Sequence, residues 1–241
     1  MANFLQTLVT QRAALLTALG QHLLLSVISL AIAIVIALPL AIWVIPRPKT
    51  ANVFLQLASV LQTIPSLALL GMLIPLVGIG SVPAVISLVV YALLPIFQNT
   101  YTGLTEIDPS LEEAATAFGM TRWEKLRKVE LPLAFPMILS GIRTALVMII
   151  GTATLAALIG AGGLGTFILL GINRNNNTMT LIGALASALL AIVLSLALRG
   201  VKRIKIKPLL ITLAVVVVAA VALVFIDLCV RNQSRSRLPV N

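Results

Sequence analysis

The sequence predicts an all-α polytopic membrane protein, and three observations support this class. The 241 residues are 60% hydrophobic and only 10% charged, and a mean hydropathy of +1.12 is too apolar for a water-soluble domain of this size. The apolar runs reach about 20 residues, the length that an α-helix needs to cross the hydrocarbon core. Short polar joints separate these runs, so spanning helices fit the pattern and a β-barrel does not.

Six apolar runs divide the chain, and we expect a five-span core plus an additional C-terminal span. Residues 1–22 carry a few polar side chains among leucines and alanines, which predicts an N-terminal segment lying at the membrane interface. The transmembrane domain is predicted over residues 23–200, and a basic joint, the additional span and a tail over residues 201–241. The predicted spans cover residues 23–45, 53–76, 83–99, 136–159, 179–198 and 209–228.

The distribution of Lys and Arg predicts the orientation, because short cytoplasmic loops collect positive charge. Arg12 and Arg174 fall on one side of the predicted topology. The larger group falls on the other side: Arg47, Lys49, Arg122, Lys125, Arg127, Lys128, Arg199, Lys202, Arg203, Lys205 and Lys207. This predicts an external N-terminus and explains the net charge of +10 without a nucleic-acid partner. Three arginines in the tail would lie outside if the sixth run spans, which counts against that span.

A loop over about residues 100–135, cytoplasmic in this topology, holds six of the seven acidic residues. Asp108 followed by Pro109 is typical of a helix start, and Gly119 can supply the left-handed turn that ends that helix. Thr121 and Glu124 then have the spacing of a capping box that begins a second helix, and we expect Pro132 to limit its far end. The loop is therefore predicted to be helix, glycine turn and helix.

Two simpler interpretations of this loop fit its pattern less well. A helix-turn-helix with basic residues can read DNA, but a hairpin of about 30 residues held at both ends by membrane spans could hardly reach a major groove. A loop that only solvates a turn would not require two capped helices joined by a glycine. A folded element that contacts a partner fits the pattern better.

The loop resembles a motif of ATP-binding-cassette importer permeases. Glu113-Ala114-Ala115, Gly119, Val129, Leu131 and Pro132 match the pattern E-A-A-x3-G-x9-I-x-L-P, with Val129 where isoleucine is usual. Residues 64–115 and 151–172 also resemble the osmoprotectant branch, the permeases of glycine betaine, carnitine and choline importers, and the likeness covers roughly residues 20–200.

The resemblance implies a coupling loop that docks into a separate ATP-binding subunit. The loop residues carried over are Glu112, Glu113, Ala114, Ala115, Phe118, Gly119, Met120, Thr121, Leu131 and Pro132. Glu113 is expected to take a polar contact from the ATPase or within the loop, and a solvated carboxylate remains the alternative. The resemblance further implies an extracytoplasmic substrate-binding protein or domain, a second permease copy, and the cell membrane of a prokaryote.

The sequence predicts no catalysis, cofactor or metal site in this chain. It contains no G-x-x-x-x-G-K-[ST] phosphate loop, so ATP would be bound by the partner subunit. The single cysteine, Cys229, excludes an internal disulfide and a Cys-based metal site. The single histidine, His22, is interpreted as an interfacial residue.

A polar stripe in the second span predicts a translocation pathway. Its members recur every three to four residues and so share one helix face: Gln56, Ser59, Gln62, Thr63 and Ser66. Polar groups are costly against lipid, so this face should meet a water-filled path, or else only hydrogen bonds from other helices. Thr152 and Thr154 in the fourth span are further pathway candidates. Pro65, Pro75 and Pro95 can break their helices locally.

We expect this chain to be the permease subunit of an ATP-driven importer for a small osmoprotectant such as glycine betaine, carnitine or choline. Its Trp and Tyr residues form no evident aromatic cage for a quaternary ammonium, so selectivity is assigned mostly to the external binding protein. Another small zwitterion or amino acid is an alternative substrate. An ion-coupled secondary transporter is a rival class, but its spans would usually carry ionisable residues, and here Arg143 stands almost alone.

Overall fold

The computed structural model describes residues 2–200, and over this range it contains helices and no strand. The predicted sixth span and tail lie outside the described residues. The α-helices are α1 Ala2–Thr10, α2 Arg12–Val44, α3 Pro48–Thr63, α4 Ser66–Val77, α5 Ser81–Thr105, α6 Pro109–Ala117, α7 Arg122–Lys125, α8 Leu131–Ala153, α9 Gly165–Asn173 and α10 Asn177–Gly200. A π-helical turn, Leu126–Glu130, precedes α8, and a 3-10 helix, Leu155–Ile159, follows it.

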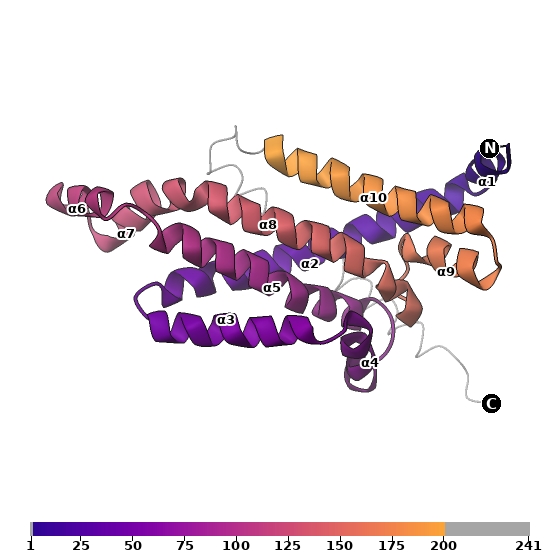
Figure 1. The fold of residues 1–241 in the computed structure, drawn as a ribbon, viewed down its shortest axis with the longest axis horizontal. Helices are drawn as coiled ribbons and strands as arrows, with labels where there is room; N and C mark the ends of the chain where they lie inside the picture. The colour runs from indigo at the N-terminus through magenta and orange to yellow at the C-terminus, as the bar shows by residue number, and fades with distance from the viewer. Residues whose placement is uncertain (1, 201–241) are drawn as a thin grey trace, which may run out of the picture.

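The long helices α2, α3, α5, α8 and α10 run along the long axis of the molecule (Figure 1). Helices α6 and α7 project at one end, which we call the loop end, whereas α1 and α9 lie at the other (Figure 1). Within residues 2–200, four helices are long and apolar enough to cross a membrane, and a fifth span is possible if α3 and α4 count as one bent span. The structure thus confirms an all-helical protein with several apolar spans.

The second predicted span is broken between α3 and α4, which meet at an angle of 95°. Pro65 has no N–H to donate and disfavours a helical conformation at the preceding residue, so Ile64 is extended. Tyr91 on α5 stabilises the break, because its hydroxyl donates to the Ile64 carbonyl and its own carbonyl accepts a 2.9 Å hydrogen bond from Gln62 Nε2. The expected break therefore occurs at Pro65, whereas Pro75 and Pro95 lie inside continuous helices.

The N-terminal segment differs from its predicted boundary. A short helix, α1, ends at Thr10, and α2 begins at Arg12 and continues without interruption to Val44. Residues 12–22 are therefore part of the same helix as the first span. Sequence could not locate this boundary, because the weakly polar residues before position 22 are equally compatible with a separate interfacial helix.

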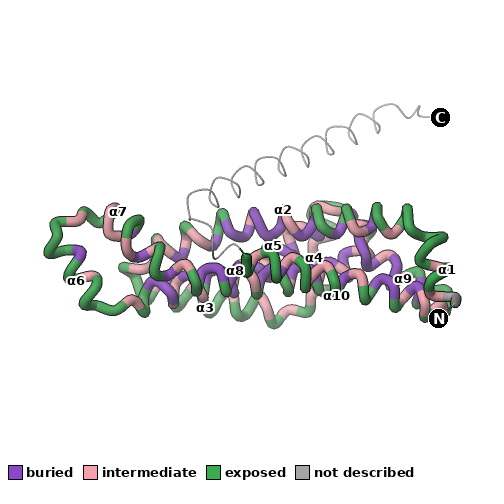
Figure 2. Tube along the Cα trace, turned by 90° about the horizontal axis from the view of Figure 1, so that it is seen from above, coloured by how far each residue is buried: buried purple, intermediate pink, exposed green. Residues whose placement is uncertain are grey.

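The core lies between α2, α5 and α8, whose buried residues face one another along the bundle (Figure 2). Small side chains permit this close packing: Ala33, Ala37 and Ala41 on α2 are completely buried. The outer face of α10 is apolar instead, and its exposed side chains suit contact with lipid. These exposed residues are Leu181, Leu185, Leu189, Ile192, Val193 and Leu196.

Candidate functional site

The first helix of the loop begins and ends as its sequence predicts. A carboxylate oxygen of Asp108 accepts a 2.9 Å hydrogen bond from the Ser110 backbone N–H, and this bond holds the pKa of Asp108 below its ordinary value. Gly119 ends the turn with φ +73°, a left-handed conformation that costs side-chain-bearing residues energy. The N–H of Met120 donates to the Ala115 carbonyl across this turn. The N-cap and the glycine turn are therefore confirmed.

The second loop helix starts at the predicted capping box but does not stop where we expected. The Thr121 hydroxyl accepts from the Glu124 N–H, and the Glu124 carboxylate accepts from the Thr121 N–H. From α7 the chain continues through the π-helical turn into α8, so Pro132 does not end the helix. Pro132 occupies the first turn of α8, where a missing N–H is tolerated because the π-helical turn has already changed the hydrogen-bond register.

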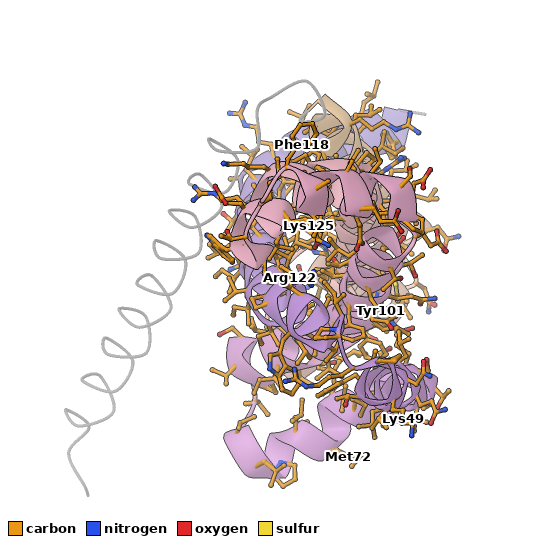
Figure 3. All side chains as sticks on the ribbon, turned by 90° about the vertical axis from the view of Figure 1, so that its left-hand side faces the viewer. Lys49, Met72, Tyr101, Phe118, Arg122 and Lys125 are labelled. Atoms are coloured by element: carbon orange, nitrogen blue, oxygen red, sulfur yellow. The ribbon has the colours of Figure 1, made fainter. Side chains whose placement is uncertain are left out.

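The predicted loop residues form a mostly exposed surface at the loop end. Ala115 is buried against the rest of the loop, Glu112, Met120 and Leu131 are half-buried, and the others are exposed: Glu113, Ala114, Phe118, Gly119, Thr121 and Pro132. Phe118 keeps 85% of its surface exposed, and Trp123, which our prediction did not select, keeps 65%. Figure 3 looks onto this end, with Phe118 near one edge and Arg122 and Lys125 nearer the middle. Aromatic side chains are enriched in protein–protein interfaces, so these two exposed rings make the loop surface a candidate docking surface.

Glu112 and Glu113 share a shallow groove between α6 and α7 with Thr116, Ala117 and Lys125. Glu112 is paired with Lys125, whose Nζ lies 3.1 Å from its carboxylate. Glu113 is exposed and forms no ion pair among residues 2–200. The groove therefore presents one paired and one accessible carboxylate beside the exposed Phe118.

The polar stripe of the second span divides between two environments. Gln56, Ser59 and Thr63 are exposed on one side of α3, whereas Gln62 turns toward α5 and bonds the Tyr91 carbonyl. Ser66 begins α4 beyond the break and is half-buried. Gln62 thus forms a hydrogen bond between helices, as the alternative interpretation of the stripe expects. The other three α3 residues form a polar face that no other part of the described structure covers.

Thr152 and Thr154 lie at the other end of the bundle from the loop, where α8 gives way to the 3-10 helix. Both are half-buried, and the Thr154 hydroxyl donates to the Gly151 carbonyl at 2.7 Å. Within residues 2–200 no hydrogen bond joins either threonine to the α3 stripe. The structure therefore does not gather the candidate pathway residues into one cluster.

His22 is completely buried inside the protein. Its Nδ1 accepts a 3.2 Å hydrogen bond from the Leu164 N–H, so the neutral ring carries its proton on Nε2 and donates to the Ile150 carbonyl at 3.1 Å. Gln21 accepts from the neighbouring Gly163 N–H at 3.0 Å. These two side chains of α2 hold the glycine-rich turn before α9. The sequence shows the glycine turn but carries no signal for its partners, which are about 140 residues away.

The ionisable residue singled out within the spans also has a partner. Arg143 on α8 donates from Nε to the hydroxyl of Ser195 on α10. This bond lies within the bundle and joins two adjacent helices. Arg143 therefore contributes to the packing of α8 against α10. This role explains a charged residue within an apolar span without requiring an ion pathway.

Comparison with known proteins identifies the family to which this architecture belongs. The model of the family "binding-protein-dependent transport system inner membrane component" matches residues 30–207. The chain belongs to this family. It is a permease subunit of an ATP-binding-cassette importer, in which a separate subunit hydrolyses ATP. This result confirms the resemblance that the loop motif indicated.

The relatives cover most of the permease. It is 41% identical over 203 residues to the glycine betaine/carnitine/choline transport system permease protein OpuCB of Bacillus subtilis, which spans 84% of this chain and 92% of that protein. It is 48% identical over 179 residues to the osmoprotectant import permease protein OsmW of Salmonella typhimurium, over 72% of this chain and 83% of that protein. The solved structure of the inward-facing MetNI methionine ABC transporter superposes with a TM-score of 0.72 at 25% identity, over 80% of this chain and 97% of that one.

Proposed function

We propose that the permease imports a small osmoprotectant of the betaine, carnitine or choline type, delivered by an external binding protein. The observation that carries this proposal is the identity of 40% or more to permeases named for these compounds, over more than two thirds of the chain. The binding protein supplies most of the selectivity, since within residues 2–200 the Trp and Tyr side chains are spread over α2, α5 and α7 and form no aromatic cage.

The loop end faces the cytoplasm in this proposal, and the N-terminus lies outside. Arg122 lies on α7 at the loop end, and the joint between α2 and α3, which carries Arg47 and Lys49, lies on the same side of the molecule, whereas Arg12 and Arg174 belong to the opposite end with α1 and α9 (Figure 1). Positive residues in short loops favour the cytoplasmic side. This orientation directs the exposed surface around Phe118 toward a cytoplasmic ATP-binding subunit. ATP binding there draws the paired loops together and shifts the pathway toward the outside.

A second copy of the permease, or a close homologue, covers the exposed polar face of α3. Gln56 on this face is costly against lipid, and water in a path between two copies would solvate it, whereas the hydroxyls of Ser59 and Thr63 donate to backbone carbonyls of their own helix. The outer face of α10 presents apolar side chains instead, which suits contact with lipid. The pathway then runs between the copies along α3.

We expect Ser59→Cys, in a Cys229→Ser background, to form a disulfide-linked or bismaleimide-linked dimer in membranes. Leu189→Cys on the apolar face of α10 is the matched control and should stay monomeric under the same treatment, because lipid covers it. The measurement is the dimer fraction on non-reducing gels. Equal cross-linking at both positions would contradict the assignment of α3 to the dimer face.

The substrate is tested by uptake into proteoliposomes that contain the permease, its ATP-binding subunit and its binding protein. We expect ATP-dependent uptake of radiolabelled glycine betaine, carnitine or choline, and competition among those that the binding protein accepts. Methionine, the substrate named for the structural neighbour, serves as the comparison. Uptake of methionine with none of the three quaternary ammonium compounds would overturn the proposed substrate class.

A further inference from the structure

Glu130 is a buried carboxylate at the point where the loop joins α8. Its side chain is 3% exposed and accepts a 3.1 Å hydrogen bond from Arg122 Nη1, and Lys125 Nζ lies 3.9 Å away. A buried carboxylate is costly unless cations and hydrogen bonds compensate for its lost hydration. Glu130 therefore ties α7 to the residue immediately before α8.

Lys125 extends this connection to α6. Its side chain is only 14% exposed, and its Nζ lies 3.1 Å from a carboxylate oxygen of Glu112 on α6. Lys125 thus stands between two carboxylates, one on α6 and one at the start of α8. We call Glu112, Lys125, Glu130 and Arg122 the ion-pair chain of the loop.

Helix α6 has few other attachments. Ala115 is its only residue buried in the described structure, and its covalent link to α7 passes through the Gly119 turn. Backbone freedom at that glycine would let α6 change its angle relative to α7 when a partner pushes on it. The ion-pair chain opposes such a pivot because it bridges the two sides of the turn.

The π-helical turn places Glu130 at this junction. Within it the Leu131 N–H bonds the Leu126 carbonyl five residues earlier, so the turn contains one residue more than an α-helical turn. One extra residue rotates the chain beyond it by about 100°. The loop can therefore present Glu130 to Arg122 and Lys125 while α8 keeps its own apolar face against α5.

A second ion pair in the same loop lacks these properties. Lys128 and Glu124 lie 2.9 Å apart, but their side chains are 61% and 41% exposed and neither of them is paired with a residue of α6. An exposed pair between residues four apart adds little and does not connect α6 to the rest of the loop. It provides a matched control for the ion-pair chain.

We propose that the ion-pair chain is the rigid link that carries a displacement of α6 into α8, with Lys125 and Glu130 as positioning residues for coupling. This inference rests on the proposed function, in which α6 docks on the ATP-binding subunit. The docking surface on α6 receives the movement from the ATP-binding subunit. The ion-pair chain then passes it on as a rotation or translation of the span that contains α8. Without the ion-pair chain, α6 would move with the ATP-binding subunit while α8 keeps its position.

The test compares Lys125→Met with Lys128→Met in proteoliposomes that hold the permease, the ATP-binding subunit and the binding protein. Methionine keeps the length of lysine and removes its charge. The readout is the number of glycine betaine molecules imported per ATP hydrolysed, together with co-purification of the ATP-binding subunit. We expect Lys125→Met to lower this ratio at least about fivefold with the subunit still bound, whereas Lys128→Met leaves it unchanged.

Lys125→Arg should restore the ratio because it keeps the charge between Glu112 and Glu130, which a role in packing alone would not require. Glu130→Gln should resemble Lys125→Met. An unchanged ratio of glycine betaine imported to ATP hydrolysed in Lys125→Met would overturn the inference. Loss of the bound ATP-binding subunit in this variant would overturn it too, because the ion-pair chain would then act in docking. Absence of ATP-dependent uptake with the unmodified permease would instead refute the proposed function.

Discussion

Gly119→Pro is expected to reduce ATP-driven uptake to background. Gly119 has φ +73°, whereas proline is restricted to about −65°, so the turn between α6 and α7 cannot form. The substitution also removes the Gly119 N–H that bonds the Thr116 carbonyl at 2.9 Å. Phe118 at the end of α6 and Trp123 on α7 would then no longer keep their relative positions on the loop surface.

Gly119→Ala separates backbone conformation from side-chain bulk. A Cβ at this position meets nothing within 4 Å, so only the positive φ is penalised, by about 1–2 kcal/mol. Uptake should therefore be reduced but measurable. The helix bundle should stay folded in both variants, because the turn lies outside it. Full uptake by Gly119→Pro would show that the loop geometry does not matter for transport.

Gly141→Val is expected to destabilise the packing of α8 against α5 strongly. A Cβ at Gly141 would lie 2.6 Å from the Pro95 carbonyl oxygen and 2.7 Å from Asn99 Cβ, so α5 and α8 would have to separate. Overpacking of this kind costs about 1–3 kcal/mol or more, and we expect the apparent melting temperature in detergent to fall by roughly 5 °C or more.

Gly151→Val is the matched control on the same helix. A Cβ there meets nothing within 4 Å, and Gly151 is exposed, so the melting temperature should stay the same or rise slightly. Melting is followed by fluorescence of a thiol-independent dye or by loss of monodisperse protein on heating. Equal stability of the two variants would mean that α5 and α8 do not pack as closely as described.

Local signals in the sequence predicted local structure well. The Asp108 N-cap, the Gly119 turn and the Thr121–Glu124 capping box each depend on residues within four positions of one another, and all three are present. Pro65 broke its helix for the same reason. Pro132 shows the limit, because the effect of a proline depends on the hydrogen-bond register that precedes it.

Contacts between distant residues could not be predicted from one sequence. His22 is a lone histidine near a span end, and only the fold shows that it binds Leu164 and Ile150. Glu130 likewise occupies the variable position of the loop motif, and only its burial and its contacts with Arg122 and Lys125 distinguish it. On a helical wheel Gln62 shares a face with Ser59. In the structure, however, its side chain donates to the Tyr91 carbonyl on α5, next to the break at Pro65.

We expect this chain to move substrate only when a separate subunit hydrolyses ATP. Uptake of radiolabelled glycine betaine is measured in proteoliposomes made with and without the ATP-binding subunit, with ATP supplied on the side where that subunit binds and with no ion gradient. Uptake against a concentration gradient should occur only when both the subunit and hydrolysable ATP are present. Accumulation driven by an imposed proton or sodium gradient in the absence of that subunit would contradict it.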